Sequence, residues 1–309
     1  MKQPDSISDL IKREALSLGF QECVIMPAAL LKEDRDHLNS WLSKGFNGEM
    51  RYMAGNKDKR VDPRKLLNNT KSIILVIQNY FTKKRQKEPD APIVSKYAFG
   101  ADYHIVIKEK LNKLLYFIQS KIAPCNGRAF TDSAPILERA WARKAGVGWI
   151  GKNSNLISKR YGSYIFIGEL LVDLELPYDK TEQVKDYCGS CTLCIDACPT
   201  KAIITDRVVD AGKCIAYQTI ERKKGPEKSF RGKLANRLFG CDICQDICPW
   251  NNKAEPHNEP GFNPDPGMLM MSFKDWINLD KKRFEEIFNR SALQRRGFEG
   301  IKKNLEFLM

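Results

Sequence analysis

Eight of the ten cysteines in this chain of 309 residues lie close together, between Cys188 and Cys248. A first run has the spacing C-x2-C-x2-C-x3-C-P and consists of Cys188, Cys191, Cys194, Cys198 and Pro199. Bacterial ferredoxins use this spacing to bind 4Fe-4S clusters through thiolates, and the fourth cysteine normally serves the other cluster of a pair. The run therefore predicts iron-sulfur chemistry and requires a second set of ligands.

That second set stands further along the chain. Cys241, Cys244, Cys248 and Pro249 repeat the end of the first motif, and Cys214 supplies one more thiol. If the motifs exchange ligands, one site consists of Cys188, Cys191, Cys194 and Cys248, and the other of Cys198, Cys214, Cys241 and Cys244. A pair of zinc sites is the alternative, but zinc sites seldom show this spacing twice. Cys23 and Cys125 lie outside both motifs, and we interpret them as small buried thiols.

Clusters transfer electrons, so a substrate site has to lie elsewhere. Asp132 ends an apolar stretch directly before a predicted helix, where a carboxylate can transfer protons in a cleft. An ordinary helix N-cap is the alternative role for Asp132. The loop before residue 104 adds Asp102 and His104 as supporting groups, and residues 146–163 form a Gly-, Asn- and Ser-rich loop that could hold a polar cofactor. No GxGxxG motif follows a strand and no Walker loop occurs, so nicotinamide and ATP lack support.

The chain is strongly basic. Lys and Arg number 51 against 38 Asp and Glu, which gives a formal net charge of +13. Such an excess indicates a polyanionic partner. The densest basic run lies between two cluster cysteines, where phosphate contacts are one interpretation and a solvated surface is the other. Its cationic residues are Arg222, Lys223, Lys224, Lys228, Arg231, Lys233 and Arg237.

Hydrophobic periodicity predicts alternating helices and strands in the first half of the chain. Helices are expected at about 6–18, 34–44, 104–122 and 135–145, and strands at about 22–27, 72–80, 127–131 and 164–173. This alternation favours a layered α/β or α+β sandwich that positions Asp132 at a strand end. The sequence has no signal-peptide pattern and no uncharged apolar run of the roughly 18 residues that a membrane span needs. We therefore expect a cytoplasmic protein without membrane association.

Composition divides the chain into three predicted parts. Residues 1–178 form the catalytic domain, residues 179–255 the two-cluster module, and residues 256–309 a short helical tail. Proline and charge without periodicity mark a linker at about 174–187, and a segment rich in Pro, Asn and Gly marks a second loop at 251–267.

Several stretches together resemble one family, the epoxyqueuosine reductases of tRNA modification. They are YAFGADYH, TDSAPILERAWARKAGVGWIGKN, RYGSYIFIGELL, CGSCTLCIDACPTKAI, KCIAYQTIE and FGCDICQDICPWN. The resemblance implies an α+β fold, in which a nitroreductase-like α/β sandwich binds cobalamin and precedes a ferredoxin-like module with two 4Fe-4S clusters. Longer members continue into a helical-repeat segment, and the resemblance implies that the tail of this chain stops at the junction to it.

The resemblance also implies a reaction and its participants. A base-off cobalamin would receive electrons through the clusters from an external low-potential donor, and Asp132 would donate protons with Asp102 and His104 nearby. The substrate would be epoxyqueuosine at the wobble position of tRNA, reduced to queuosine by a monomeric enzyme. The implied cobalamin contacts are Arg60, Lys152, Asn153, Ser154, Gly162, Ser163, Ile215, Tyr217, Gln218 and Asp242.

Three other functions fit parts of the pattern. A corrinoid reductive dehalogenase, or another small-molecule reductase, would use the same cofactors, but the basic excess and the missing export signal disfavour it. A dicluster electron-transfer protein does not need the roughly 180 residues that precede the first motif. A zinc-dependent RNA-binding module would be colourless when purified.

Overall fold

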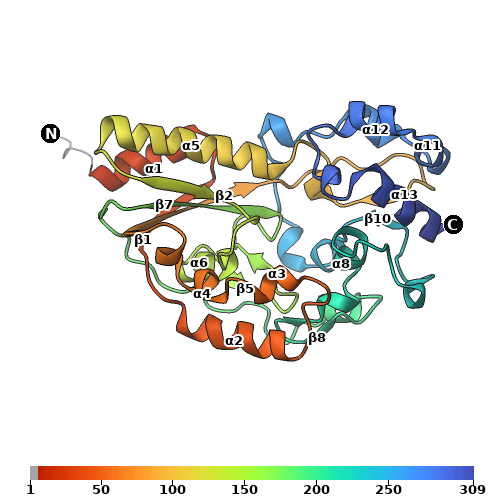
Figure 1. The fold of residues 1–309 in the computed structure, drawn as a ribbon, viewed down its shortest axis with the longest axis horizontal. Coiled ribbons are helices and arrows are strands. Elements are labelled where there is room, and N and C mark those ends of the chain that lie inside the picture. Colours follow the sequence, from red (N-terminus) through yellow and green to blue (C-terminus); the bar gives the residue numbers. More distant parts are fainter. Residues whose placement is uncertain (1–5) are drawn as a thin grey trace.

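The computed structural model describes residues 6–309, and the first half of the chain is built around a four-stranded sheet (Figure 1). The strands lie in the order β1 (Glu22–Pro27), β2 (Ser72–Asn79), β7 (Ile165–Val172) and β4 (Gly127–Phe130). Each neighbouring pair is antiparallel. The central strands β2 and β7 are almost wholly buried, because their sequences SIILVIQN and IFIGELLV are rich in residues that favour a covered sheet.

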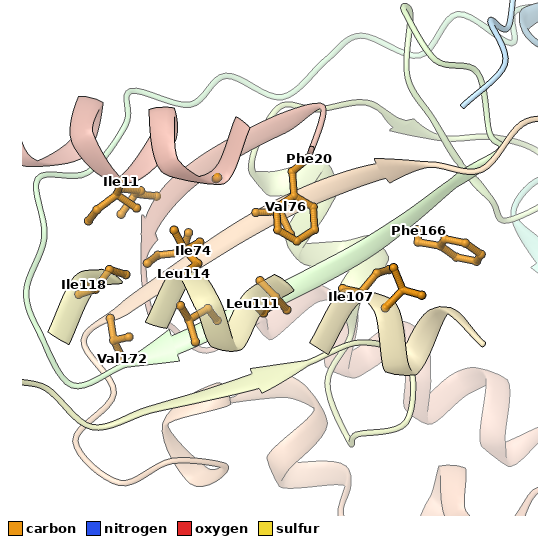
Figure 2. Packing of buried hydrophobic residues seen from close by; sticks show 14 of the residues in the cluster. Ile11, Phe20, Ile74, Val76, Ile107, Leu111, Leu114, Ile118, Phe166 and Val172 are labelled. Carbon is orange, nitrogen blue, oxygen red and sulfur yellow. The ribbon is translucent and has the colours of Figure 1, made fainter. Parts of the chain in front are cut away.

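Helices cover both faces of this sheet. On one face lie α1 (Ile7–Ser17) and α5 (Tyr103–Lys121), whose side chains pack on β2 and β7. Figure 2 shows this layer, with Ile11 of α1 and Leu111 of α5 beside Ile74 and Val76 of β2. The opposite face is covered by α6 (Glu138–Lys144), by Leu31 directly before α2 (Lys32–Ser43) and by Val61 of α4 (Lys57–Val61), which follows α3 (Arg51–Ala54).

The sequence predicted these elements well. The eight expected helices and strands of the first half are present, and the predicted α+β class is confirmed. One boundary differs by three residues, since the helix expected at 135–145 begins at Glu138. Residues 131–137 instead form an irregular loop, and Asp132 adopts a left-handed backbone conformation there that a helix cannot include.

The cysteine module consists of short elements. They are α7 (Leu193–Asp196), β8 (Ile203–Thr205), β9 (Val208–Val209), α8 (Ile215–Ile220), β10 (Arg237–Phe239) and α9 (Ile243–Asp246). Helices α7 and α9, one from each cysteine motif, pack together. Three small strand pairs are present: β8 pairs with β9, β10 runs parallel to β3 (Ile93–Val94), and β5 (Trp149–Ile150) pairs with β6 (Leu156–Ile157).

The C-terminal helices share a core with both preceding parts. This tail contains α10 (Pro266–Met270), α11 (Phe273–Asn278), α12 (Lys281–Phe288) and α13 (Gly297–Leu308), and α13 lies beside β10 (Figure 1). Trp276 and Phe284 are fully buried in one cluster with Phe99 of the first part and Phe239 of the module. Within residues 6–309 there is no helix of the length and apolarity needed to cross a membrane.

Candidate active site and cluster module

Three of the predicted residues form one chain of contacts. The Oδ2 atom of Asp132 accepts a 2.6 Å hydrogen bond from the Tyr103 hydroxyl and lies 3.4 Å from His104 Nε2. The other ring nitrogen, His104 Nδ1, lies 2.6 Å from Asp102 Oδ1. The imidazole therefore stands between two carboxylates, which is an arrangement that can hold and transfer a proton.

The electrostatics of this chain place a proton on the imidazole. Burial lowers the pKa of His104, but hydrogen bonds to Asp102 and Asp132 outweigh it and raise the pKa to about 9. Burial raises the pKa of Asp132, but hydrogen bonds from His104 and Tyr103 outweigh that effect and lower the pKa to about 2. At neutral pH the pair therefore consists of an imidazolium, which holds the proton, and a carboxylate 3.4 Å away.

Parts distant in sequence position these side chains. The Asp102 carboxylate caps α5 by accepting a 3.0 Å hydrogen bond from the His104 amide, and the Asp102 amide donates to the Arg290 carbonyl of the tail at 2.5 Å. The Tyr103 ring stacks on Phe166 of β7, with centroids 4.2 Å apart and planes 7° from parallel. The sheet and the tail thus both fix the start of α5.

The acid chain faces a cavity of about 450 Å³ between the first part of the chain and the tail. Its lining consists of Tyr97, Asp102, Tyr103, His104, Asp132, Ser133, Ile220, Glu221, Ala292 and Arg295. Arg295 pairs with Glu221 at 2.5 Å. Sequence reasoning missed Tyr97, Tyr103 and Arg295. The two tyrosines stand in the stretch that carries Asp102 and His104 and could have been found, whereas no pattern singles out Arg295.

Arg60 also lies within electrostatic reach of the acid. Burial lowers the pKa of its guanidinium, and the charges of Tyr52 and Asp132 partly offset this effect. One terminal nitrogen of Arg60 donates to the Tyr52 carbonyl at 2.9 Å. Its buried Nε has no hydrogen-bond partner among the described residues. An unused donor near Asp132 is consistent with a polar ligand between them.

The other nine predicted cofactor residues do not line the Asp132 cavity. Several use their polar atoms in the fold: Ser154 Oγ donates to the Arg207 carbonyl, the Ser163 amide donates to Asn251 Oδ1, and Gln218 Nε2 donates to the Gly212 carbonyl. Gly162 has a φ of 66°, and a Cβ there would lie 2.1 Å from Asn251 Oδ1.

Of the other five residues, all except Ile215 connect the first part of the chain to the module. Asn153 Nδ2 donates to the Cys244 carbonyl at 3.2 Å, and the Tyr217 hydroxyl accepts from the Glu49 amide at 2.7 Å. The remaining three are mostly buried: Lys152 lies 3.4 Å from Asp206, Asp242 accepts from the Lys96 amide at 2.8 Å, and Ile215 packs with Phe230 and Leu234.

The motif cysteines fall into two interacting groups. Burial raises the pKa of Cys194, and the thiols of Cys188, Cys248 and Cys191 raise it further. Burial likewise raises the pKa of Cys244, followed by Cys214 and Cys241, while Cys214 interacts with Cys198. Most of these interactions join thiols within the two sets of four that the spacing predicts, and the assignment of these sets as cluster ligands stays a prediction. Cys244 also interacts with Cys194, so the two groups are neighbours.

All ten cysteines are free thiols, and within residues 6–309 no group of three or more His, Cys, Asp or Glu side chains is placed to hold a single metal ion. Cys23 and Cys125 are half-buried and stand apart from both groups. Burial raises the pKa of Cys23 to about 12, which makes its thiol unreactive at neutral pH.

The predicted basic run is only partly available to a ligand. Five members are exposed, namely Lys223, Lys224, Lys228, Arg231 and Lys233. Arg222 is half-buried and forms an ion pair with Glu227 at 3.2 Å, and Arg237 is half-buried in β10. The exposed part begins directly after Glu221, which lines the Asp132 cavity.

An α+β domain with an acidic proton-transfer chain, joined to a module of eight thiols in two groups, defines the class of iron-sulfur-dependent reductases. Comparison with known proteins agrees. Residues 60–133 match the family described as epoxyqueuosine reductase QueG, DUF1730, and residues 187–251 match the 4Fe-4S double cluster binding domain. The chain is 49% identical over 308 residues to the epoxyqueuosine reductase of Cellulophaga algicola, covering all of both chains, and 46% identical over 302 residues to that of Cyclobacterium marinum, covering 97% and 96%.

Solved structures give the same result. An epoxyqueuosine reductase with an epoxyqueuosine-modified tRNA-Tyr stem loop matches with a TM-score of 0.87 at 30% identity, covering 98% of this chain and 80% of that one. A Bacillus subtilis epoxyqueuosine reductase, whose catalytic aspartate loop is swung out of the active site, matches with a TM-score of 0.85 at 30% identity and the same coverage. A catabolic reductive dehalogenase bound to 3-bromo-4-hydroxybenzoic acid shares the fold at 14% identity and a TM-score of 0.50, over 79% of this chain and 32% of that one.

The chain belongs to the epoxyqueuosine reductase family. It is an oxidoreductase that reduces epoxyqueuosine in tRNA, and its cysteine module binds two 4Fe-4S clusters. The identities of 46–49% to members of this family decide against the dehalogenase alternative, and the catalytic domain decides against a simple electron carrier.

Proposed function

We propose that the Asp102–His104–Asp132 chain delivers protons to the epoxide oxygen of epoxyqueuosine at the wobble position of tRNA. The observation that carries this proposal is the placement of His104 between two carboxylates, 3.4 Å from Asp132 and 2.6 Å from Asp102, on the wall of a cavity of about 450 Å³. Converting the epoxide to the alkene of queuosine with release of water consumes two electrons and two protons. The residues of this chain supply the protons.

Proton delivery divides between the two charged side chains. The imidazolium of His104 holds the proton, and Asp132, which is half exposed to the cavity, passes it to the substrate oxygen. Tyr103 keeps the carboxylate oriented through its 2.6 Å hydrogen bond. Asp102 stabilises the imidazolium between transfers.

Base-off cobalamin is the cofactor that we propose for this site, held between the first domain and the cluster module. Arg60 fits such a group, because its buried Nε lacks a partner and its charge interacts with Asp132. Lys152, Asn153, Gly162 and Tyr217 would contact the cofactor at the junction with the module. When bound, cobalamin supplies low-potential reducing equivalents next to the substrate.

The remaining assignments follow from the module. Cys188, Cys191, Cys194 and Cys248 would ligate one cluster, and Cys198, Cys214, Cys241 and Cys244 the other, with electrons entering from an external low-potential donor. The mutual effects of the thiols on their pKa values support this division.

The exposed cations that follow Glu221 would bind tRNA phosphates. We propose that the enzyme acts as a monomer in the cytoplasm.

Asp132→Asn tests the proton-delivery assignment. An asparagine side chain cannot pass a proton to the substrate oxygen. Single-turnover formation of queuosine should therefore fall at least about 100-fold, the range of general acid catalysis. The assay uses anaerobically reconstituted enzyme with iron, sulfide, cobalamin and epoxyqueuosine-containing tRNA, and nucleoside analysis by mass spectrometry.

The matched control is Asp36→Asn, an exposed aspartate on α2 whose side chain is 73% exposed. This control should retain wild-type turnover. Cluster absorption, cobalamin retention and tRNA binding should be the same in both variants. Wild-type turnover by the Asp132→Asn enzyme would reduce Asp132 to a structural loop residue.

A further inference from the structure

One thiol of the cysteine module accepts a hydrogen bond from a side chain of the first domain. The indole Nε1 of Trp149 donates to Cys188 Sγ at 3.4 Å. Trp149 is the first residue of β5 and is 2% exposed, and Cys188 is the first thiol of the C-x2-C-x2-C-x3-C-P motif. The two residues are 39 positions apart, so the contact joins the domain to the module.

Trp149 differs in this respect from the two other buried tryptophans of the described chain. Trp141 and Trp276 are 0% exposed, and the indole nitrogen of each lacks a hydrogen-bond partner among the described residues. Those two side chains contribute to the fold through their rings. Trp149 contributes a ring and also a polar donor that is directed at a sulfur.

Aromatic rings and a second thiol surround this hydrogen bond. Trp250 packs edge-on against Trp149 with ring centroids 4.9 Å apart, and Tyr187 does so at 5.4 Å. Cys188 and Cys248, one thiol from each motif, pack in the same hydrophobic group as Trp149. Thiols from both motifs that meet in one group fit a shared iron-sulfur cluster. Because Trp149 is almost inaccessible to water, its hydrogen bond lies in a medium of low dielectric, where hydrogen bonds are stronger.

Contacts on both sides hold the indole in place. Trp149 belongs to the β5–β6 hairpin, and in the loop of this hairpin Asn153 Nδ2 donates to the Cys244 carbonyl of the second thiol group at 3.2 Å. From the module, Arg207 Nε donates to the Ile150 carbonyl at 3.0 Å. The hairpin is therefore fixed against the module, and the indole donor with it.

We propose that Trp149 raises the reduction potential of the cluster that Cys188 ligates, by donating a hydrogen bond to the Cys188 sulfur. When the external low-potential donor passes one electron to this cluster, the cluster gains one negative charge, part of which falls on its sulfurs. A donor directed at one sulfur stabilises the reduced cluster more than the oxidised one, so reduction becomes easier. Trp149 is thus a positioning residue for electron transfer that acts through Cys188. This inference rests on the proposed ligand role of Cys188 and is independent of Asp132.

Trp149→Phe tests the inference in the full chain with both clusters reconstituted. Phenylalanine keeps an aromatic ring but has no N–H, so the equilibrium constant for reduction of one cluster should fall about tenfold. For one electron this lowers the midpoint potential by about 59 mV. The measurement is an anaerobic redox titration followed by electron paramagnetic resonance of the reduced clusters. Trp276→Phe, at a fully buried indole in the C-terminal core, is the matched control and should leave both potentials unchanged.

Isotope labelling detects the hydrogen bond without reference to the potential. In enzyme whose tryptophans carry 15N in the indole ring, pulsed electron paramagnetic resonance of the reduced clusters should show coupling to an indole nitrogen. Trp149→Phe should abolish this coupling, and Trp276→Phe should retain it.

The outcomes separate this inference from its alternatives. An unchanged potential or a surviving 15N coupling in Trp149→Phe would overturn it, and so would a higher potential, which would show that the indole acts by excluding water. Should Trp149→Phe fail to fold, benzothienylalanine at position 149 has the shape of tryptophan without the N–H, and its potential decides the question. Full iron content in Cys188→Ser would refute the ligand assignment itself. Iron loss in Cys188→Ser together with a wild-type potential in Trp149→Phe would refute the role of Trp149 alone.

Discussion

At the scale of single residues, the site gives different roles to two carboxylates, Asp102 and Asp132. Asp102 and Asp132 both line the cavity, but the side chain of Asp132 is 51% exposed and that of Asp102 is 25% exposed. The His104 imidazole lies between these two carboxylates, so its two ring nitrogens can accept a proton on one side and donate a proton on the other. The chemistry thus depends on the protonation of His104 at neutral pH.

The pKa of His104 can be measured directly, because the chain contains only three histidines. In NMR of enzyme with 13C-labelled histidine, one imidazole should titrate near pH 9, and His104→Gln should remove that signal. Asp102→Asn should lower the titration midpoint by roughly one to two units, since it removes one of two carboxylates that favour the imidazolium. A midpoint near 6.5 in the wild type would contradict the stabilisation of the imidazolium by the two carboxylates.

The same shift affects stability with a defined sign. Because the folded-state pKa of His104 lies above its unfolded value, the imidazolium stabilises the fold most below about pH 6.5. This stabilisation is lost as the pH rises through about 9. The difference in unfolding temperature between the wild type and His104→Gln should therefore shrink from pH 6 to pH 10.

At the scale of elements, the cysteine module depends on two short helices from different motifs. Helices α7 and α9 pack together, which brings Cys248 to the group that begins at Cys188. Cys248→Ser should therefore remove one cluster and lower the iron content from about eight to about four atoms per chain. Cys125→Ser, outside both groups, should leave the iron content unchanged. Full iron content in Cys248→Ser would show that Cys248 is not a ligand.

Elements also explain what the sequence could predict. Periodic segments such as the helix at 104–122 and the strand at 72–80 carry their own hydrophobic pattern, and both are present. Cysteine spacing likewise predicted the double 4Fe-4S cluster domain, because each motif is local in sequence. The contact of Asp132 with His104 crosses 28 positions and depends on how β4 and α5 lie on the same sheet.

At the scale of the whole molecule, the net charge of +13 includes a run of exposed cations that follows the cavity-lining residue Glu221 in the sequence. The five exposed cations between Lys223 and Lys233 begin beside Glu221 of the cavity wall. The tail helix α12 carries three other exposed cations, Lys281, Lys282 and Arg283, which provide an internal comparison. A tRNA that reaches Asp132 would meet the first group.

Salt dependence of tRNA affinity tests this surface. Replacing Lys223, Lys224 and Lys228 with Gln should flatten the slope of log affinity against log salt by roughly two to three, because each lost phosphate contact removes about 0.7–0.9 from the slope. Fluorescence anisotropy with an epoxyqueuosine stem loop between 50 and 200 mM salt is a suitable measurement. The same change at Lys281, Lys282 and Arg283 should leave the slope unaltered, and equal effects of the two triple variants would argue for diffuse attraction.

The tail that lines the cavity also affects the order in which the parts of the enzyme fold during synthesis. The cavity draws on Tyr97 early in the chain and on Arg295 late in it, and the Asp102 amide is held by the Arg290 carbonyl. Contacts between residues this distant in sequence form slowly, because a long loop has to close before they gain any energy. A nascent chain that has emerged only as far as the cluster module therefore lacks part of its acid site. We expect the cysteines to be available for cluster assembly before the enzyme can act on tRNA, so that protein synthesis itself sets the order of maturation.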